Sequence, residues 1–222
     1  MMDDTVEYYN RNADAFFDST IHADMSEQIR AFLEFLPAGG TILDAGCGSG
    51  RDSLVFMERG FHVEAFDASE EMCKRAAKVL GKEVLQCRFE DMAYQEQFDG
   101  IWACASLVHV KKEDLPEVIR RICGALKAGG ILYASFKKGE GEKYRGERRF
   151  TDANETVLQT LLSPYFDILM MRNSEDVRPD RAGETWINVI AGKRQETEEI
   201  HKSDNRYIEE YKELIRYVRE EP

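Results

Sequence analysis

The sequence predicts one α/β domain built on a doubly wound, mostly parallel sheet of seven strands, whose last strand is antiparallel. Three observations predict this fold. Apolar runs of strand length alternate with helical patterns between residues 41 and 137, a glycine-rich turn follows the first run, and the last two runs have no helix between them. A chain of 222 residues is long enough to bury one substantial core.

Two helices are expected ahead of the sheet, over residues 6–17 and 25–36. They end at the turn Pro37-Ala38-Gly39-Gly40. We expect residues 1–37 to form a helical cap and residues 38–194 to form the sheet core, so that a single domain covers the chain up to residue 194.

Five strands and three helices account for the middle of the chain. The strands are expected at residues 41–45, 61–67, 83–88, 98–104 and 130–137. The helices between them are expected at residues 52–59, 69–80 and 112–127. Ser69 caps the second helix, and glycines follow the end of each one. Crossovers of this kind join parallel strands.

The rhythm changes after Lys137. A polar loop and a helix over 152–162 lead to two strands, 165–172 and 185–193, which a loop containing Pro179 joins, so these strands should pair antiparallel. Residues 195–222 are expected to form an amphipathic C-terminal helix, which packs on the domain, forms a dimer contact or stands free. We therefore expect a monomer or a homodimer. The apolar positions that recur in this segment are Ile200, Tyr207, Ile208, Tyr211, Leu214, Ile215 and Val218.

The charge balance is acidic, with 30 Lys and Arg against 42 Asp and Glu and a formal net charge of −12. This charge repels a phosphate backbone at long range and disfavours nucleic acid as a partner. A basic cluster is a local exception, and it is either a solvated loop or a contact for an anionic substrate. Its members are Lys137, Lys138, Lys143, Arg145, Arg148 and Arg149.

The five cysteines are widely spaced and include no Cys-x-x-Cys pair, so neither a metal site nor a disulfide framework is expected. They suit a reducing cytoplasm. No apolar run approaches the roughly 18 to 20 residues that cross a bilayer, and the start Met1-Met2-Asp3-Asp4 is acidic where a secretory signal is basic. We expect a cytoplasmic protein without membrane attachment.

The turn after the first strand reads Asp44-Ala45-Gly46-Cys47-Gly48-Ser49-Gly50. Its glycines lack Cβ atoms, so backbone can approach a ligand closely, and ligands of open α/β sheets bind at such strand ends. The second strand ends in Asp67, whose carboxylate can accept hydrogen bonds from both hydroxyls of a ribose. Together the turn and this acid predict an adenosine-type cofactor.

The loop spacing separates two kinds of cofactor. Dinucleotide folds use Gly-x-Gly-x-x-Gly and place a pyrophosphate at the helix N-terminus, whereas this loop is one residue shorter. Asp44 would repel a pyrophosphate but can face the amino group of an amino-acid moiety. Arg51 can pair with the carboxylate of that moiety or with Asp52 or another surface acid. An NAD-dependent oxidoreductase is the less favoured enzyme.

Residues 42–50 resemble the first motif of the class I S-adenosylmethionine-dependent methyltransferases, which have a Rossmann-like fold. Residues 67–72 resemble their second motif, residues 98–102 their fourth strand, and residues 126–130 the turn before strand five. The similarity spans about residues 38 to 137. Outside this part there is a weaker likeness to small bacterial methyltransferases of the tellurite-resistance and ubiquinone-biosynthesis types.

The resemblance implies S-adenosyl-L-methionine as the cofactor and a site with three parts. The methionine moiety would lie against Asp44, Gly46 and Gly48, the ribose on Asp67, and the adenine near Met72. After the third strand, Glu90 or Asp91 would meet the adenine amino group. Further cofactor contacts are expected from Cys47, Gly50, Arg51, Ala68, Phe89 and Cys104.

Residues 103–110 occupy the place where the family's loop faces both the sulfonium and the acceptor. In-line displacement at a sulfonium chiefly needs the acceptor atom to be aligned in a dry pocket, so no catalytic triad is expected. His109 is the candidate catalytic base for an acceptor hydroxyl or amine, although a histidine here can also simply pack at a helix end.

The acceptor pocket is expected from parts of the chain outside the shared core. Tyr9 and Phe17 line it or pack as ordinary apolar residues, and Trp186 is a further candidate. Arg178 and Arg181 can bind a carboxylate or phosphate, or join a surface network with Asp176, Asp180 and Glu184. The sequence thus indicates methyl transfer to an O, N or S atom of a small-molecule acceptor, the alternative being a cofactor-binding sensor or partner subunit without turnover.

Overall fold

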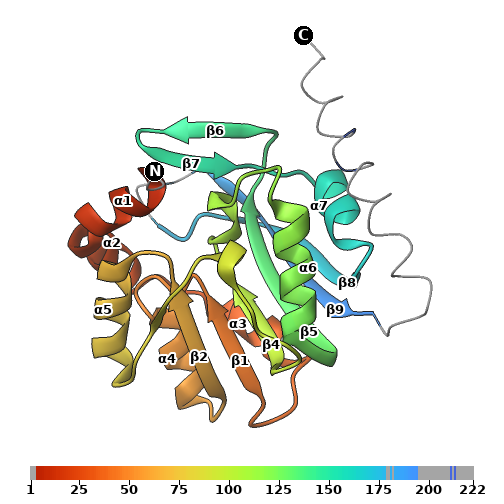
Figure 1. Ribbon diagram of the computed structural model, residues 1–222, viewed down its shortest axis with the longest axis horizontal. Coiled ribbons are helices and arrows are strands. Elements are labelled where there is room, and N and C mark those ends of the chain that lie inside the picture. Colours follow the sequence, from red (N-terminus) through yellow and green to blue (C-terminus); the bar gives the residue numbers. More distant parts are fainter. Residues whose placement is uncertain (1–3, 179–180, 182, 195–210, 212, 214–222) are drawn as a thin grey trace.

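A seven-stranded sheet forms the centre of the molecule in this computed structural model, which describes residues 4–178, 181, 183–194, 211 and 213 (Figure 1). The strand order is β3-β2-β1-β4-β5-β9-β8. In this sheet β9 runs antiparallel to both of its neighbours, and the other pairs are parallel. The predicted fold class is confirmed. The strands are β1 (Thr41–Ala45), β2 (His62–Asp67), β3 (Leu85–Gln86), β4 (Phe98–Ala103), β5 (Leu126–Lys137), β8 (Phe166–Glu175) and β9 (Thr185–Lys193).

Helices cover both faces of the sheet because successive strand residues point to opposite sides. Ile42 of β1 belongs to an apolar cluster with Phe32 and Phe56, whereas its neighbour Leu43 belongs to a second cluster with Val118. Each of these side chains is fully buried, and such burial contributes about 1.5–3 kcal/mol per side chain. The covering helices are α3 (Ser26–Leu33), α4 (Arg51–Glu58), α5 (Glu70–Leu80), α6 (Leu115–Ala125) and α7 (Glu155–Leu162).

The ends of α5 match the local signals in the sequence. The Ser69 hydroxyl accepts a hydrogen bond from the Met72 backbone N–H at 3.2 Å, which satisfies a free donor of the first turn. Gly81 closes the helix in the left-handed conformation, with φ of +64°.

The first predicted helix is in fact two, α1 (Asp4–Arg11) and α2 (Ala13–Thr20), so the prediction of one helix over residues 6–17 is wrong. The break lies at Asn12, whose side-chain amide donates a hydrogen bond to the Tyr8 carbonyl at 2.9 Å. The backbone of Asn12 itself departs from the helical conformation, with φ of −110° and ψ of 19°. The break changes the direction of the chain above the sheet.

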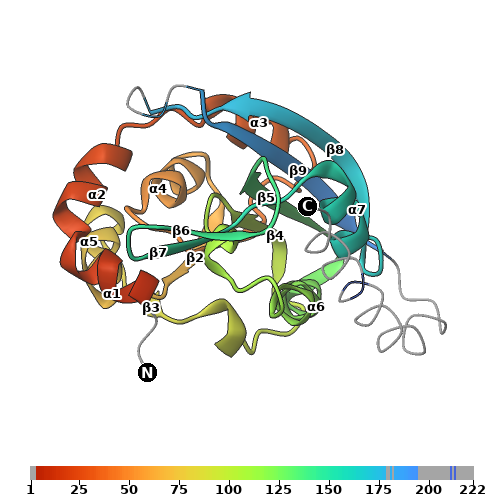
Figure 2. The ribbon, with the colours of Figure 1, turned by 90° about the horizontal axis from the view of Figure 1, so that it is seen from above.

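The predicted polar loop after Lys137 contains a two-stranded hairpin, β6 (Glu142–Arg145) and β7 (Arg148–Thr151), which is a second correction. Charged and aromatic residues alternate in Lys143-Tyr144-Arg145, but Arg148-Arg149-Phe150 does not alternate, so the sequence of this segment resembles a polar loop. Seen from above, the hairpin crosses the edge of the sheet where the parallel strands end, with α1 and α2 beside it (Figure 2).

Two strands differ in extent from the prediction. β3 is only two residues long, and both are exposed at the edge of the sheet, because it pairs with β2 alone. β5 begins at Leu126 rather than at residue 130, since Leu126 pairs with Phe98 ahead of a register shift. Residues 126–130, which were expected to form a turn before this strand, are therefore part of β5.

The expected C-terminal helix lies outside the described residues, except for Tyr211 and Glu213. Tyr211 is fully buried in the larger core cluster, and burial raises the pKa of its phenol. Within the described part of the chain, no helix is both long enough and apolar enough to cross a membrane.

Candidate functional site

A cavity of about 240 Å³ lies at the carboxyl ends of β1, β2, β4 and β5, the place where ligands of open α/β sheets bind. The roof consists of α1, α2 and the β6–β7 hairpin (Figure 2). Because of the strand order, the ends of β1 and β2 line one part of the cavity, which we call the near end. The ends of β5, β8 and β9 line the opposite part, the far end, and the segment after β4 lies between them.

The glycine loop brings backbone to the near end. Gly46 and Cys47 both donate their N–H groups to the Phe66 carbonyl at 2.9 Å, which fastens the loop to the end of β2. A Cβ atom on Gly46 would lie 2.4 Å from the Ser106 Cβ, and Gly48 has a φ of +54° with the Phe16 ring above it. Only glycine fits the first position without displacing its neighbour.

Gly50 has a different role from the one expected for it. It precedes α4 with a φ of +78°, and an added Cβ would lie 3.2 Å from the Cβ of Ala76. It is not among the residues that line the cavity. Gly50 therefore allows α4 and α5 to approach each other and does not line the cavity.

Asp44 is a buried carboxylate at the near end, 2% exposed, which accepts a hydrogen bond from the Ser53 hydroxyl at 2.6 Å. Burial and then the negative charge of Asp52 raise the pKa of Asp44 to about 7. Both effects disfavour the ionised form. A cationic group placed beside Asp44 would reverse this balance.

Arg51 pairs with its neighbour Asp52 through two hydrogen bonds of 2.7 and 2.8 Å. Its remaining nitrogen donates to the Thr20 carbonyl at 3.1 Å, while the Trp102 indole donates to Asp52 at 2.8 Å. Of the two partners considered for Arg51, the structure shows Asp52. The guanidinium still lines the cavity.

Asp67 lies across the glycine loop at the end of β2. One carboxylate oxygen accepts the Gly48 N–H at 3.0 Å and the other accepts the Ser69 N–H at 2.9 Å. Burial raises the pKa of Asp67, whereas these backbone hydrogen bonds lower it. Several residues expected at the cofactor line the cavity around it: Ala68, Met72, Phe89 and Glu90.

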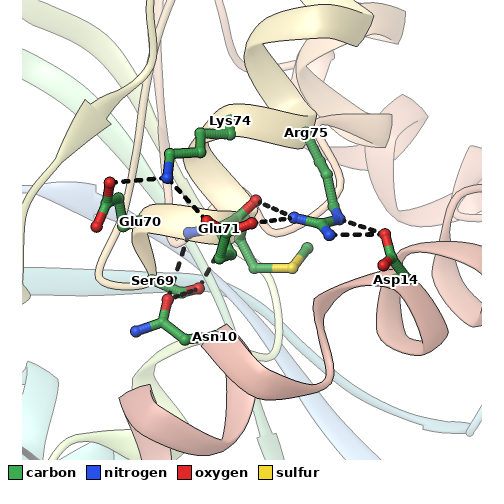
Figure 3. Close-up of polar contacts among 8 residues, drawn as sticks. Asn10, Asp14, Ser69, Glu70, Glu71, Lys74 and Arg75 are labelled. Carbon is green, nitrogen blue, oxygen red and sulfur yellow. Dashed lines mark hydrogen bonds and ion pairs between the residues drawn. The ribbon is translucent and has the colours of Figure 1, made fainter.

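A polar network fastens the N-terminal helices to α5 beside this carboxylate (Figure 3). The side-chain amide oxygen of Asn10 accepts hydrogen bonds from the Ser69 hydroxyl at 2.7 Å and from the Glu71 backbone N–H at 3.3 Å. Arg75 joins Glu71 of its own helix to Asp14 of α2 at 2.8 and 2.6 Å. The roof of the cavity is thus held to the element that begins next to Asp67.

The roof presents Tyr9 and Phe16 to the cavity, but not Phe17. Phe17 instead lines a separate depression between α2 and α5, together with Asp14, Asp18 and Arg75. Successive helical residues point about 100° apart, so the break at Asn12 decides which aromatic faces inward. The expectation that Phe17 lines the pocket is not met, and Phe16 takes that place.

Small residues follow β4 between the two ends of the cavity. Ala105 has a φ of +54°, and its N–H donates to the Ser135 hydroxyl at 2.8 Å. The Ser106 hydroxyl donates to the Ala45 carbonyl at 2.7 Å. Cys104 also lines the cavity, and burial raises the pKa of its thiol to about 12, so it is a neutral thiol rather than a nucleophile.

His109 lies next to these small residues with both ring nitrogens engaged. Nδ1 is 2.7 Å from the Arg149 carbonyl oxygen, and Nε2 is 2.9 Å from the Tyr9 hydroxyl. A carbonyl only accepts, so Nδ1 carries a hydrogen, and in the neutral ring Nε2 accepts the Tyr9 O–H. The site therefore contains a hydrogen-bonded tyrosine–histidine pair, with the histidine orientated by β7.

Arg178 and Trp186 line the far end and share one carboxylate. Arg178 donates two hydrogen bonds to Asp176 at 2.9 and 2.7 Å, and the Trp186 indole donates to the same group at 3.0 Å. Burial alone would raise the pKa of Asp176, but the hydrogen bonds from Arg178 and Trp186 outweigh it and lower this pKa to about 2. Arg181 also lines the far end and lies 3.6 Å from Glu184.

The basic cluster, for which the sequence left open a solvated loop or a contact for an anionic substrate, contributes Lys137 and Arg148 to the lining of the cavity. Lys137, 4% exposed, pairs with Glu184 and lies over the rings of Phe150 and Trp186 at 5.2 and 5.3 Å. Despite this ion pair, burial and then the charge of Arg145 lower the pKa of Lys137 to about 8. The signal for Arg148 in the sequence was its place in the basic cluster.

Comparisons with known proteins agree with this geometry. Residues 42–130 match the family described as "Methyltransferase domain". A putative methyltransferase of Bacillus subtilis, YqeM, is 28% identical over 94% of this chain and 84% of its own length. A tRNA (carboxymethyluridine(34)-5-O)-methyltransferase of Arabidopsis thaliana is 32% identical over 71% of this chain, which spans only 39% of that protein.

A solved structure with the same fold is the 1,6-didemethyltoxoflavin-N1-methyltransferase of Burkholderia thailandensis, with bound substrate and S-adenosylhomocysteine. It superposes with a TM-score of 0.69 at 24% identity, over 86% of this chain and 85% of that one. The sheet order, glycine loop and strand-end acid define a Rossmann-like methyltransferase domain. The family match makes residues 42–130 a methyltransferase domain, and the chain resembles the class I S-adenosylmethionine-dependent methyltransferases in sequence and fold.

Proposed function

We propose that this enzyme transfers a methyl group in line to an oxygen, nitrogen or sulfur atom of a small-molecule acceptor that occupies the far end of the cavity. The observation that carries this proposal is the continuity of one cavity from the glycine loop and Asp67, past the segment after β4, to the far end. Reacting groups bound at the two ends would meet beside Cys104, Ala105 and His109.

The residues at the near end fit S-adenosylmethionine. Asp67 offers a carboxylate for the ribose, Gly48 leaves a cradle that a Cβ would fill, and Asp44 offers a buried carboxylate for the ammonium of the methionine moiety. Bound there, the cofactor supplies an electrophilic methyl group on a positively charged sulfur. The protein's part is to hold the acceptor atom in line and to exclude water.

A hydroxyl or ammonium acceptor must also lose a proton, and the Tyr9–His109 pair can take it. The acceptor's proton would pass to the Tyr9 oxygen while the Tyr9 proton passes to Nε2 of His109. Nδ1–H stays on the Arg149 carbonyl, which keeps Nε2 as the accepting atom. A thiolate or carboxylate acceptor would not use this relay.

The names of two similar proteins point to different acceptors, a tRNA and 1,6-didemethyltoxoflavin. The class of acceptor therefore depends on this chain's own cavity and charge. The net charge of −12 opposes a polyanion, and the roof of α1, α2 and the hairpin covers the strand ends. Both features favour a small acceptor.

Metabolite profiling of cells with and without the gene product is the experiment that tests this proposal. We expect a methylated small molecule that disappears with the gene and is formed again by the purified protein with S-adenosylmethionine. His109→Gln should then lower the turnover of a hydroxyl acceptor by about 10²-fold or more at neutral pH. Cofactor binding without turnover on any metabolite would instead support a sensor or partner subunit.

A further inference from the structure

The charges that line the cavity differ in sign between its two ends. At the near end the described lining residues include four carboxylates and two guanidiniums: Asp44, Asp52, Asp67 and Glu90, with Arg51 and Arg88. At the far end they include four cations and two carboxylates: Lys137, Arg148, Arg178 and Arg181, with Glu175 and Asp176. The near end suits a cationic ligand, and the far end suits an anionic one.

The acids behind the far end do not neutralise it. Glu184 lies close to three cations at once, Lys137, Arg145 at 2.6 Å and Arg181 at 3.6 Å. Asp176 is committed to Arg178 and to the Trp186 indole. Lys137 and Arg145 share this one carboxylate, so positive charge remains beside the cavity, where the low dielectric strengthens its attraction for an anion.

Arg148 is the far-end cation for which the described chain provides no carboxylate. Its guanidinium lies over the rings of Tyr8 at 4.6 Å and Phe150 at 5.4 Å. Its Nε is buried and makes no hydrogen bond to any described residue. A guanidinium held by stacking keeps its planar fork of donors for another group, and carboxylates and phosphates match that fork with two parallel hydrogen bonds.

The same guanidinium lies next to the proton-accepting pair. Arg148 is 5.9 Å from the Tyr9 ring centroid, and Phe150 packs against His109 at 4.8 Å. Burial raises the pKa of the Tyr9 phenol, and the charge of Arg148 opposes this rise. An anionic group on Arg148 therefore places the rest of a small acceptor among aromatic rings, beside Tyr9 and His109. Aromatic walls favour a flat, apolar body.

We infer that the acceptor is a small organic anion whose carboxylate or phosphate group pairs with Arg148 beside Lys137, while its flat body lies among Tyr9, Phe150 and Trp186. This inference rests on the proposed function, because it takes the far end as the acceptor site. In this arrangement Arg148 determines which acceptor binds, and methyl transfer takes place beside the segment after β4.

The test is isothermal titration of the whole chain, saturated with S-adenosylhomocysteine, with three probes of one shape: benzoate, phenyl phosphate and benzamide. We expect at least one of the two anions to bind, and neutral benzamide to bind about 10-fold more weakly or not at all. Arg148→Gln should weaken binding of that anion by about 10-fold or more, the value of a charge-assisted hydrogen-bond pair. Benzoate and phenyl phosphate distinguish a carboxylate from a phosphate as the recognised group.

Arg120→Gln is the matched control, because it removes the same charge from an exposed ion pair with Glu117 on α6. It should bind the anion as the wild type does. Unchanged S-adenosylhomocysteine affinity in Arg148→Gln shows that the variant folds. Equal binding of benzamide and the anions, or full anion binding by Arg148→Gln, would overturn the inference. Failure of the wild type to bind S-adenosylhomocysteine would instead count against the proposed function.

Discussion

The near and far ends of the cavity are built in different ways. Backbone atoms of the glycine loop and carboxylates at the ends of neighbouring strands make the near end, whereas the far end consists of side chains from β5, the hairpin and β9. The near end is acidic and the far end is basic. Under our inference, this difference lets the cationic cofactor bind at one end and an anionic acceptor at the other, so that the two meet beside the segment after β4.

The largest expected effect is at the backbone of the near end. Gly48→Val adds a branched side chain toward the cavity at a φ of +54°, so we expect S-adenosylhomocysteine affinity to fall on the order of 100-fold or more in calorimetric titrations. Gly60→Val is the control, since Gly60 has a φ of +85° with no atom within 4 Å of an added Cβ. If both variants bind alike, backbone strain and not the cradle explains the loss.

A smaller loss of cofactor affinity is expected when the Asp67 carboxylate is removed. Asp67→Ala removes the acceptor that also orders the Gly48 N–H, and it should weaken cofactor binding by about 1–3 kcal/mol. Asp14→Ala removes an exposed carboxylate from the nearby ion pair with Arg75 and should leave the affinity unchanged. Unaltered binding by Asp67→Ala would remove this carboxylate from the site.

The near end should also make cofactor binding depend on pH. The pKa of Asp44 is raised to about 7, so below pH 7 the free protein holds a neutral Asp44, and ionising it to meet an ammonium costs free energy. We expect S-adenosylhomocysteine affinity to increase from pH 6 to pH 8, by up to about 10-fold per pH unit below 7. Asp44→Asn should bind weakly with a flat profile. A wild-type profile that is equally flat contradicts this role for Asp44.

The smallest effect is expected from Lys137 at the far end. Lys137 already pairs with Glu184, so Lys137→Met should weaken binding of the anion probe by only about 3-fold to 10-fold and leave cofactor binding intact. Lys138→Met is the matched control, because Lys138 forms its own ion pair, with Glu155, on the surface. A loss of cofactor affinity in Lys137→Met would show that the two ends are not separate.

Much of the near end could be predicted because its signals are local. The loop glycines, Asp67 and the Ser69 cap are adjacent in sequence to the strands and helix they serve, so spacing alone locates them. Their contacts with a bound cofactor stay a prediction. Gly50 shows the limit of the pattern, since the third glycine packs two helices together.

The far end could not be predicted in the same way because tertiary contacts define it. Arg148 is part of a run of charged residues that resembles a solvated loop until the hairpin places it over Tyr8 and Phe150. Phe16 and Phe17 are equally apolar, and only the break at Asn12 decides which of them faces the cavity. Local spacing in the sequence therefore determines neither the position of Arg148 nor which of the two phenylalanines faces the cavity.

A crossed titration tests the separation of the two ends most directly. S-adenosylhomocysteine and the anion probe that binds more tightly are each titrated into Asp67→Ala and Arg148→Gln. We predict that Asp67→Ala loses cofactor affinity and keeps the anion, and that Arg148→Gln loses the anion and keeps the cofactor. If either variant loses both ligands to the same extent, or neither variant loses its own ligand, the account of two oppositely charged ends is contradicted.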